Sequence, residues 1–212
     1  MEIPWHVIAS QKWRGLAVLR RHLGWTRALR LGLELEKRLQ RGMPFGEESS
    51  LSVDPDVRWS RAQIGPAIVL YNVLRESVES ERALEWTRAV VLESAEVWMR
   101  HALGDLNVDR WRQLDSAGRL QLLSSRTSRF RNMTLADVRV AEDSAFFRVT
   151  ACRFPALCAD AGVPELAPVF CEVDAHFFGG VEKSIRLERP ETLATGGGGC
   201  PFSLAWVGDS QP

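Results

Sequence analysis

The spacing of apolar residues changes once along this 212-residue chain, and that change limits the folds it can adopt. Up to about residue 130 the apolar residues recur at helical spacing, as in Leu16, Leu19 and Leu23. Beyond that point, ADVRVAED and SAFFRVTACRF alternate polar and apolar residues on either side of an acidic turn at Glu142 and Asp143. Helices that precede strands indicate an α+β fold.

We therefore expect a mainly helical region over residues 1–130 and an α+β region over residues 131–212, joined in one compact unit. The second region reads as a small antiparallel sheet with an inserted helix. Its first two strands form the hairpin, and KSIRLERPETLA and CPFSLAWV supply the last two. The inserted helix starts near Pro164, and Pro168 restricts its regular part to the residues that follow.

Within the helical region, residues 13–39 have the pattern of an amphipathic helix with a basic face, which we interpret as scaffold or oligomer interface. Gly, Pro and Ser residues predict a connecting loop over residues 41–60. A second helical stretch is expected over residues 61–103 with an interruption near Gly65 and Pro66, followed by a shorter helix over 109–124.

Composition narrows the classes of function. Lys plus Arg is 27 and Asp plus Glu is 27, so no net field favours nucleic acid. No run of about 18 apolar residues predicts a membrane span, and no leader pattern is visible at the start, so we expect a cytoplasmic location. The partners expected are a small-molecule substrate and a second copy of the chain in a homo-oligomer.

The four cysteines are expected to be free thiols, since the cytoplasm is reducing. Their spacing lacks the paired C-x-x-C knuckles of common zinc sites, so neither a metal nor a cofactor is expected. The sequence also lacks H-E-x-x-H, G-x-S-x-G and a G-x-G-x-x-G that follows a strand. These absences disfavour zinc proteases, serine hydrolases and dinucleotide oxidoreductases.

The residues with chemical potential gather in the last third of the chain. Cys152 ends a strand pattern, Cys171 and Asp174 share one face of the inserted helix, and Cys200 begins the last strand. A cysteine is a nucleophile only as thiolate, and a neighbouring aspartate opposes that form unless a cation intervenes. A glycine run, residues 196–199, precedes Cys200 and could present backbone N–H groups to an anion.

In this order the pieces resemble the L-2-amino-thiazoline-4-carboxylic acid hydrolase family. The C-terminal half of that family reads as a strand with Cys, then Leu/Phe-Cys-x-x-Asp, then Thr-Leu-Ala-x-Gly-Gly, then Cys and an aromatic residue. The matching pieces here are Cys152, residues 170–174, residues 192–197, and Cys200 with Phe202. The resemblance covers about the last third of the chain, and Cys158 has no counterpart in it.

The resemblance implies hydrolytic opening of a small cyclic amidine, such as 2-aminothiazoline-4-carboxylate, at a C–N bond. It implies Cys171, Asp174 and Cys200 as catalytic residues. Cys152 and the backbone of Gly197, Gly198 and Gly199 would then bind substrate. Two alternatives stay open: the thiolates and the carboxylate hold a transition metal such as zinc or iron, or the cysteines only line the pocket of a non-catalytic binding module.

Several other polar residues have simpler interpretations. His101 lies in a last helical turn before Gly104, where an imidazolium complements the helix dipole. His176, next to two phenylalanines, is expected to be packed or hydrogen-bonded in the core. Three arginines that precede the first strand are expected to face water, although their spacing could also hold a carboxylate: Arg126, Arg129 and Arg131.

Overall fold

The computed structural model describes residues 3–45, 54–104 and 106–207. Its first half is helical: α1 (Trp5–Leu23), α2 (Trp25–Arg41), α3 (Pro55–Arg75), α4 (Ser80–Leu103), α5 (Val108–Gln113) and α6 (Ser116–Thr127). A four-stranded sheet follows, which confirms the α+β expectation. In the described part of the chain, none of the helices has the length and apolarity needed to cross a membrane.

The first helical segment is two helices and not one, which corrects the expectation for residues 13–39. Gly24 separates α1 from α2 with φ +73°, a left-handed value that glycine adopts without strain. Its N–H donates to the carbonyl of Arg20 and caps α1. The helical spacing continues on both sides of this glycine, so periodicity alone does not locate the break.

The expected break near Gly65 and Pro66 is also wrong, because α3 runs through both residues. The helix begins at Pro55, inside the segment predicted as a loop, and the Asp54 side chain caps it by accepting from the N–H of Asp56 at 2.7 Å. Residues 46–53 of that predicted loop lie outside the described residues. A Cβ on Gly65 would approach Met43 Sδ to 2.6 Å, so this glycine permits close packing of the chain that follows α2.

The shorter helix expected over residues 109–124 divides into α5 and α6. Its break has a local cause: the Asp115 carboxylate accepts from the N–H of Gly118 at 2.8 Å and caps α6. Two indoles then join this region to the sheet, since the Trp111 ring stacks on Trp206 with centroids 4.1 Å apart. The Trp111 N–H donates to the Ala141 carbonyl at the hairpin turn.

The sheet is antiparallel, with strand order β1-β2-β4-β3. Its strands are β1 (Met133–Val140), β2 (Ser144–Cys152), β3 (Ile185–Glu188) and β4 (Cys200–Trp206), and the hairpin at Glu142 and Asp143 is confirmed. Between β2 and β3 lie α7 (Arg153–Asp160), η1 (Pro164–Leu166), α8 (Ala167–His176) and η2 (Phe177–Val181). The regular helix starts at Ala167 with Pro168 in its first turn, as expected. A 3-10 turn, η3 (Leu193–Thr195), precedes β4.

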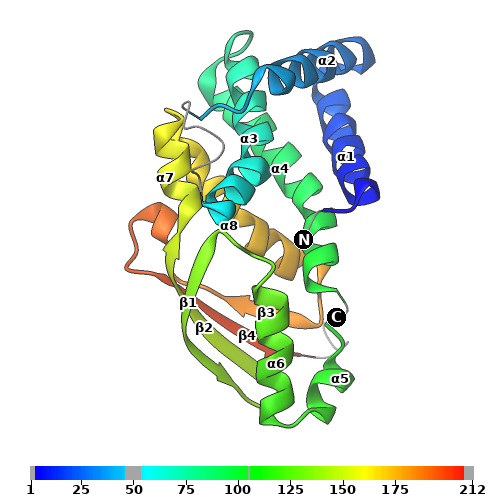
Figure 1. Cartoon of the computed structure of the whole chain (residues 1–212). Helices are drawn as coiled ribbons and strands as arrows, with labels where there is room; N and C mark the ends of the chain where they lie inside the picture. Colours follow the sequence, from blue (N-terminus) through cyan, green and yellow to red (C-terminus); the bar gives the residue numbers. More distant parts are fainter. Residues whose placement is uncertain (1–2, 46–53, 105, 208–212) are drawn as a thin grey trace.

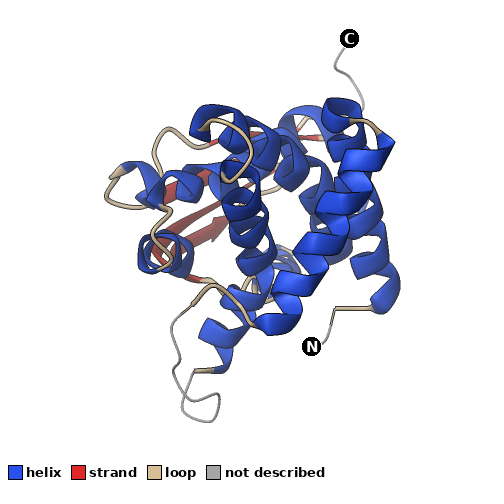
Figure 2. Ribbon diagram, turned by 90° about the horizontal axis from the view of Figure 1, so that it is seen from above, coloured by secondary structure: helices blue, strands red, loops and turns tan. Residues whose placement is uncertain are grey.

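One face of the sheet is buried against the helices. Alternate residues of β2 point into the core, including Phe147 and Val149, and Phe202 of β4 stacks on Phe147 with ring centroids 4.8 Å apart. The buried residues of the sheet and of the helices belong to one hydrophobic cluster. Figure 1 shows α4, α6 and α8 beside the sheet and α1 and α2 further from it, and Figure 2 shows the strands grouped to one side of the molecule. The division between residues 1–130 and 131–212 stays a prediction.

Candidate active site

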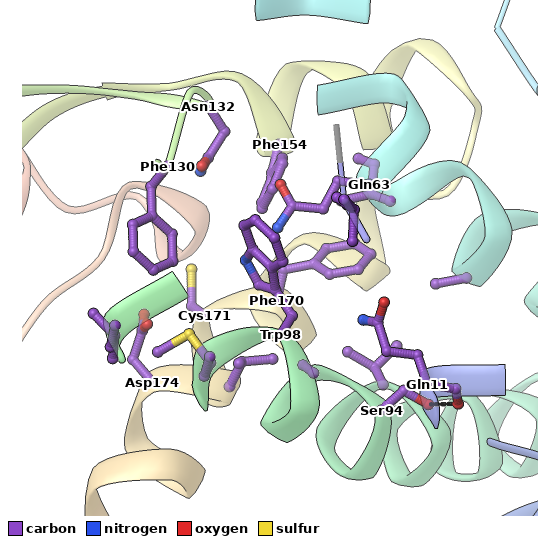
Figure 3. Close-up of a pocket in the computed structure, with 18 of the residues that line it drawn as sticks. Gln11, Gln63, Ser94, Trp98, Phe130, Asn132, Phe154, Phe170, Cys171 and Asp174 are labelled. Carbon is purple, nitrogen blue, oxygen red and sulfur yellow. Dashed lines mark hydrogen bonds between the residues drawn. The ribbon is translucent and has the colours of Figure 1, made fainter. Parts of the chain in front are cut away.

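A cavity of about 760 Å³ lies between the helices and the buried face of the sheet. Helices α1 to α4 contribute to its lining, as do α8 and strands β2 and β4. Most of the lining side chains are apolar, and the close-up in Figure 3 shows Trp98, Phe130, Phe154 and Phe170 around it. Its volume lies in the range of about 300–1,000 Å³ typical of ligand pockets.

Three separate elements bring three cysteines to this cavity. Cys152 is the last residue of β2, Cys171 lies on α8, and Cys200 is the first residue of β4. All three line the cavity, as the sequence motif implied, and all are free thiols. Cys158, on α7, is also free but fully buried away from the lining. It therefore packs as a small apolar residue.

Asp174 lines the same cavity one helical turn after Cys171, and its carboxylate pairs with Arg189. The Arg189 guanidinium lies 2.6 Å from Asp174 Oδ2 and donates a second hydrogen bond, also of 2.6 Å, to the carbonyl oxygen of Cys171. The Arg189 side chain is 9% exposed and the Asp174 side chain 23% exposed. Because Asp174 lines the cavity, its carboxylate can also accept a hydrogen bond from a ligand.

Arg189 is the residue that the sequence reasoning missed. It directly follows β3, and its guanidinium also stacks 5.0 Å from the centroid of the Phe202 ring. Its guanidinium is the cation that a thiolate at Cys171 needs when a carboxylate, Asp174, lies beside it. The only signal in the sequence is an arginine between a strand and Pro190, which many surface turns share.

The pKa values of two of the thiols are set chiefly by burial. Burial raises the pKa of Cys171 to about 11, with the Arg189 charge opposing this rise and the Asp174 charge adding to it. Burial also raises the pKa of Cys152, against a hydrogen bond from the Asn132 amide at 3.5 Å. The ligand-free site therefore holds both as neutral thiols at neutral pH. Burial likewise raises the pKa of Asp174, and its pairing with Arg189 works in the opposite direction.

The Cys200 sulfur has a different environment. It is 5% exposed and accepts a hydrogen bond from the backbone N–H of Leu193 at 3.2 Å. In Figure 3 the Cys171 sulfur and the Asp174 carboxylate point to the same side, towards Phe130 and Asn132.

The glycine run does not reach the cavity lining. The N–H of Gly198 donates to the Glu191 carboxylate at 3.2 Å, so the anion that this loop meets is the chain's own side chain. A Cβ on Gly199 would lie 3.1 Å from the Val149 carbonyl oxygen, and one on Gly197 would lie 2.8 Å from Glu191 Oε2. These glycines permit a close approach of the loop to its neighbours, which places Cys200 opposite Val149 in the sheet.

The three arginines that precede β1 do not simply face water. Arg129 donates to the carbonyls of His101 and Ala102 at 3.0 Å and so caps the end of α4. Arg131 pairs with Asp56 at 2.5 Å, and Arg126 lines the cavity.

His101 occupies the last turn of α4, as expected, with its ring 5.8 Å from that of Trp98. His176 lies at the end of α8 and is exposed, so the expectation that it packs in the core is wrong.

The metal alternative lacks a ligand set. Within residues 3–45, 54–104 and 106–207, no group of three or more His, Cys, Asp or Glu side chains is arranged to hold a metal ion. Asp174 Oδ2 is already paired with the Arg189 guanidinium. The residues present therefore do not fit a zinc or iron centre.

The fold and the cavity together define an α+β protein with an internal cavity that carries thiols and one ion-paired carboxylate. The chain belongs to the L-2-amino-thiazoline-4-carboxylic acid hydrolase family, whose sequence model matches residues 58–204. The match extends from α3 into β4, well beyond the last third of the chain that the motif covers. A search of curated proteins and a search of solved structures each found no match.

Proposed function

We propose that this protein is a hydrolase that opens a small cyclic amidine, such as 2-aminothiazoline-4-carboxylate, by cysteine chemistry. The family to which the chain belongs supports the hydrolase class. The observation that carries the proposal is the meeting of Cys152, Cys171, Cys200 and the Asp174–Arg189 pair in one cavity, although they come from separate elements.

The first step that this geometry supports is activation of the thiol by the substrate itself. A neutral amidine is basic enough to take the proton of the Cys171 thiol, which leaves a thiolate beside an amidinium. The Asp174 carboxylate then accepts a charge-assisted hydrogen bond from the amidinium N–H. The new cation lowers the pKa of a thiol that burial otherwise raises to about 11.

The bond changes follow from that ion pair. The thiolate forms an S–C bond to the amidine carbon, the ring C–N bond breaks, and the ring nitrogen leaves as an amine with the proton. A water molecule then adds to the same carbon and the enzyme thiolate leaves, taking back a proton. The product is an S-carbamoyl cysteine, and the net reaction consumes one water molecule. Cys200 is the competing nucleophile, because it lines the same cavity and its sulfur already accepts a hydrogen bond from the Leu193 N–H.

The test is turnover of 2-aminothiazoline-4-carboxylate followed by mass spectrometry, with and without chelator. We expect Cys171→Ala and Asp174→Asn to lower kcat by at least about 100-fold, the scale of lost nucleophilic or charge-assisted catalysis. Cys158→Ala is the matched control, since it removes a buried thiol outside the lining and should retain turnover. Full activity of Cys171→Ala together with loss in Cys200→Ala would move the nucleophile to Cys200.

The bond that opens is read from the product. Cleavage of the C–N bond releases a primary amine, whereas cleavage of the ring C–S bond releases a thiol and gives an N-carbamoyl cysteine of the same mass. Thiol titration of the product separates the two. Retained turnover in all three variants of the proposed site would refute the assignment.

A non-catalytic binding role is the second candidate, and one observation favours it. Burial raises the pKa of Cys171 and of Cys152, and neutral thiols are apolar lining and not nucleophiles. This role predicts that the cyclic amidine binds to the protein and is recovered unchanged after prolonged incubation.

A further inference from the structure

The cavity is much larger than the molecule that the family name suggests. 2-Aminothiazoline-4-carboxylate has about nine non-hydrogen atoms, whereas a cavity of this class holds a drug-sized ligand. The cavity measures about 760 Å³ and continues from Cys171 and Asp174 to residues of α1 and α2. A small amidine at Asp174 would leave most of that volume unfilled.

The part beyond the thiols is lined mainly by apolar side chains from four helices, with Gln11, Ser94 and the exposed Lys12–Glu36 pair also in the lining. Among the apolar residues are Leu16 and Leu19 of α1, Leu35 and Leu39 of α2, Leu70 of α3 and Val91 of α4. The charged pair, Asp174 and Arg189, lies at the other end with the cysteines. The cavity is therefore amphipathic along its length: the thiols and the buried ion pair lie at α8, and a mainly apolar end lies between α1 and α2, where the charged pair Lys12–Glu36 is exposed to solvent.

The apolar end reaches the protein surface. Ile8, Leu29 and Leu33 line the cavity and are nevertheless 41%, 48% and 72% exposed. These three residues lie on α1 and α2 and form the solvent-exposed rim of the cavity.

Two polar atoms along the lining lack partners. Trp98 is 7% exposed, and among the described residues neither its indole N–H nor the Gln63 side-chain oxygen has a hydrogen-bond partner. Both residues line the cavity and are labelled in Figure 3. A buried polar atom without a partner costs free energy that a ligand group can recover. This pattern is expected of a site that is completed by its ligand.

We propose that the substrate is an amphipathic molecule, with an amidine-type head at Asp174 and a hydrocarbon or aromatic tail that extends between α1–α4 towards the Ile8, Leu29 and Leu33 rim. The head assignment rests on the proposed function, and the tail assignment rests on the lining alone. A polar group between head and tail would pair with the Trp98 N–H or with Gln63. The small cyclic amidine is then the reacting part of a larger substrate.

The test uses S-alkylisothioureas, which carry the same N–C(=N)–S core on an alkyl chain. Binding of the S-methyl, S-butyl and S-octyl compounds to the full chain is measured by calorimetry below their micellar concentrations. We expect Kd to fall about three- to four-fold for each added methylene, the value for transfer of a CH₂ group from water to an apolar site. A Kd that does not change with chain length would overturn the tail assignment.

A substitution in α2 tests where the tail lies. Gly32 lines the cavity, and a Cβ built on it meets no atom within 4 Å, so a larger side chain fits without backbone strain. Gly32→Phe should abolish the gain from butyl to octyl and leave binding of the S-methyl compound unchanged. Gly32→Ala, the matched control, should keep the gain. If the affinity increased from the butyl to the octyl compound as much in Gly32→Phe as in the wild type, the inference would be overturned. A second copy of the chain that covers the Ile8, Leu29 and Leu33 rim would also overturn it.

The outcome is separable from that of the hydrolase test. Turnover of 2-aminothiazoline-4-carboxylate with no dependence on chain length would leave the proposed function standing and remove the amphipathic substrate. A clear dependence of Kd on chain length with no turnover of any cyclic amidine would keep the amphipathic ligand and remove the proposed hydrolase function.

Discussion

The Asp174–Arg189 pair permits a quantitative prediction about stability. The substitution Arg189→Met removes a guanidinium that is 9% exposed and leaves the Asp174 carboxylate and the Cys171 carbonyl without their donor. Loss of one partner of a buried ion pair costs about 3–5 kcal/mol. Because the Asp174 side chain is 23% exposed, part of its charge is solvated, and we expect the lower end, about 3 kcal/mol.

The assay is urea unfolding of the wild type and the variant at pH 5 and pH 8. In thermal unfolding, the same loss of about 3 kcal/mol in the free energy of unfolding corresponds to a fall in Tm of roughly 6–12 °C for a chain of this size. Arg186→Met is the matched control: Arg186 lies on β3, the strand that Arg189 follows, is 58% exposed and pairs with Glu188 at 3.5 Å. A surface pair of this kind contributes about 0–1 kcal/mol.

The pH dependence has a definite sign. Burial already raises the pKa of Asp174, and loss of Arg189 removes the main influence that lowers it. Folding of the variant then favours the protonated carboxyl. Its stability is greatest below the unfolded pKa of about 3.9 and falls as the pH rises through the higher folded pKa. The difference in the free energy of unfolding between Arg189→Met and the wild type should therefore be smaller at pH 5 than at pH 8.

Two results would refute this reasoning. One is an Arg189→Met variant that is no less stable than Arg186→Met, which would mean that the buried pair contributes no more than a surface pair. The other is failure of a second substitution to compensate. In Arg189→Met/Asp174→Asn the buried charge is gone, so the double variant should recover about 2 kcal/mol of the loss.

The other predictions concern one thiol and two glycines. Burial raises the pKa of Cys171 to about 11, so only about 0.1% of this thiol is thiolate at pH 8. Its labelling by iodoacetamide should therefore be slow at pH 8, and the rate should rise tenfold per pH unit. Peptide mapping at several pH values checks this, and labelling at the rate of a free cysteine would contradict it. Gly24→Ala should lower stability by about 1 kcal/mol, because Gly24 has φ +73° and no atom within 4 Å of its Cβ position. Gly32 has the same open surroundings but lies within a regular helix, so Gly32→Ala should raise stability by up to about 1 kcal/mol. Thermal unfolding of both variants checks this. A change of Tm in the same direction for Gly24→Ala and Gly32→Ala would show that the backbone conformation of the glycine is not the cause.

Much of the secondary structure follows from local patterns. The hairpin at Glu142 and Asp143 and the start of α8 near Pro168 are predicted correctly, because strand alternation and proline geometry act over a few residues. The break at Gly24 is not predicted, and the break predicted near Pro66 does not occur, although the residues on either side have helical spacing in both cases. Whether a glycine ends a helix, or a proline is accommodated in one, depends on the packing of neighbouring helices.

The sequence by itself determined the order of helices and strands, and it determined which residues carry reactive groups. It placed Cys152, Cys171 and Cys200 at the end, within and at the start of regular elements, since periodicity and caps are written in neighbouring residues. Only the tertiary structure decided that Arg189 pairs with Asp174, that the glycine run meets Glu191, and that one cavity joins the thiols to residues of α1 and α2. These features arise from contacts between elements distant in the chain, which no local spacing of residue types encodes.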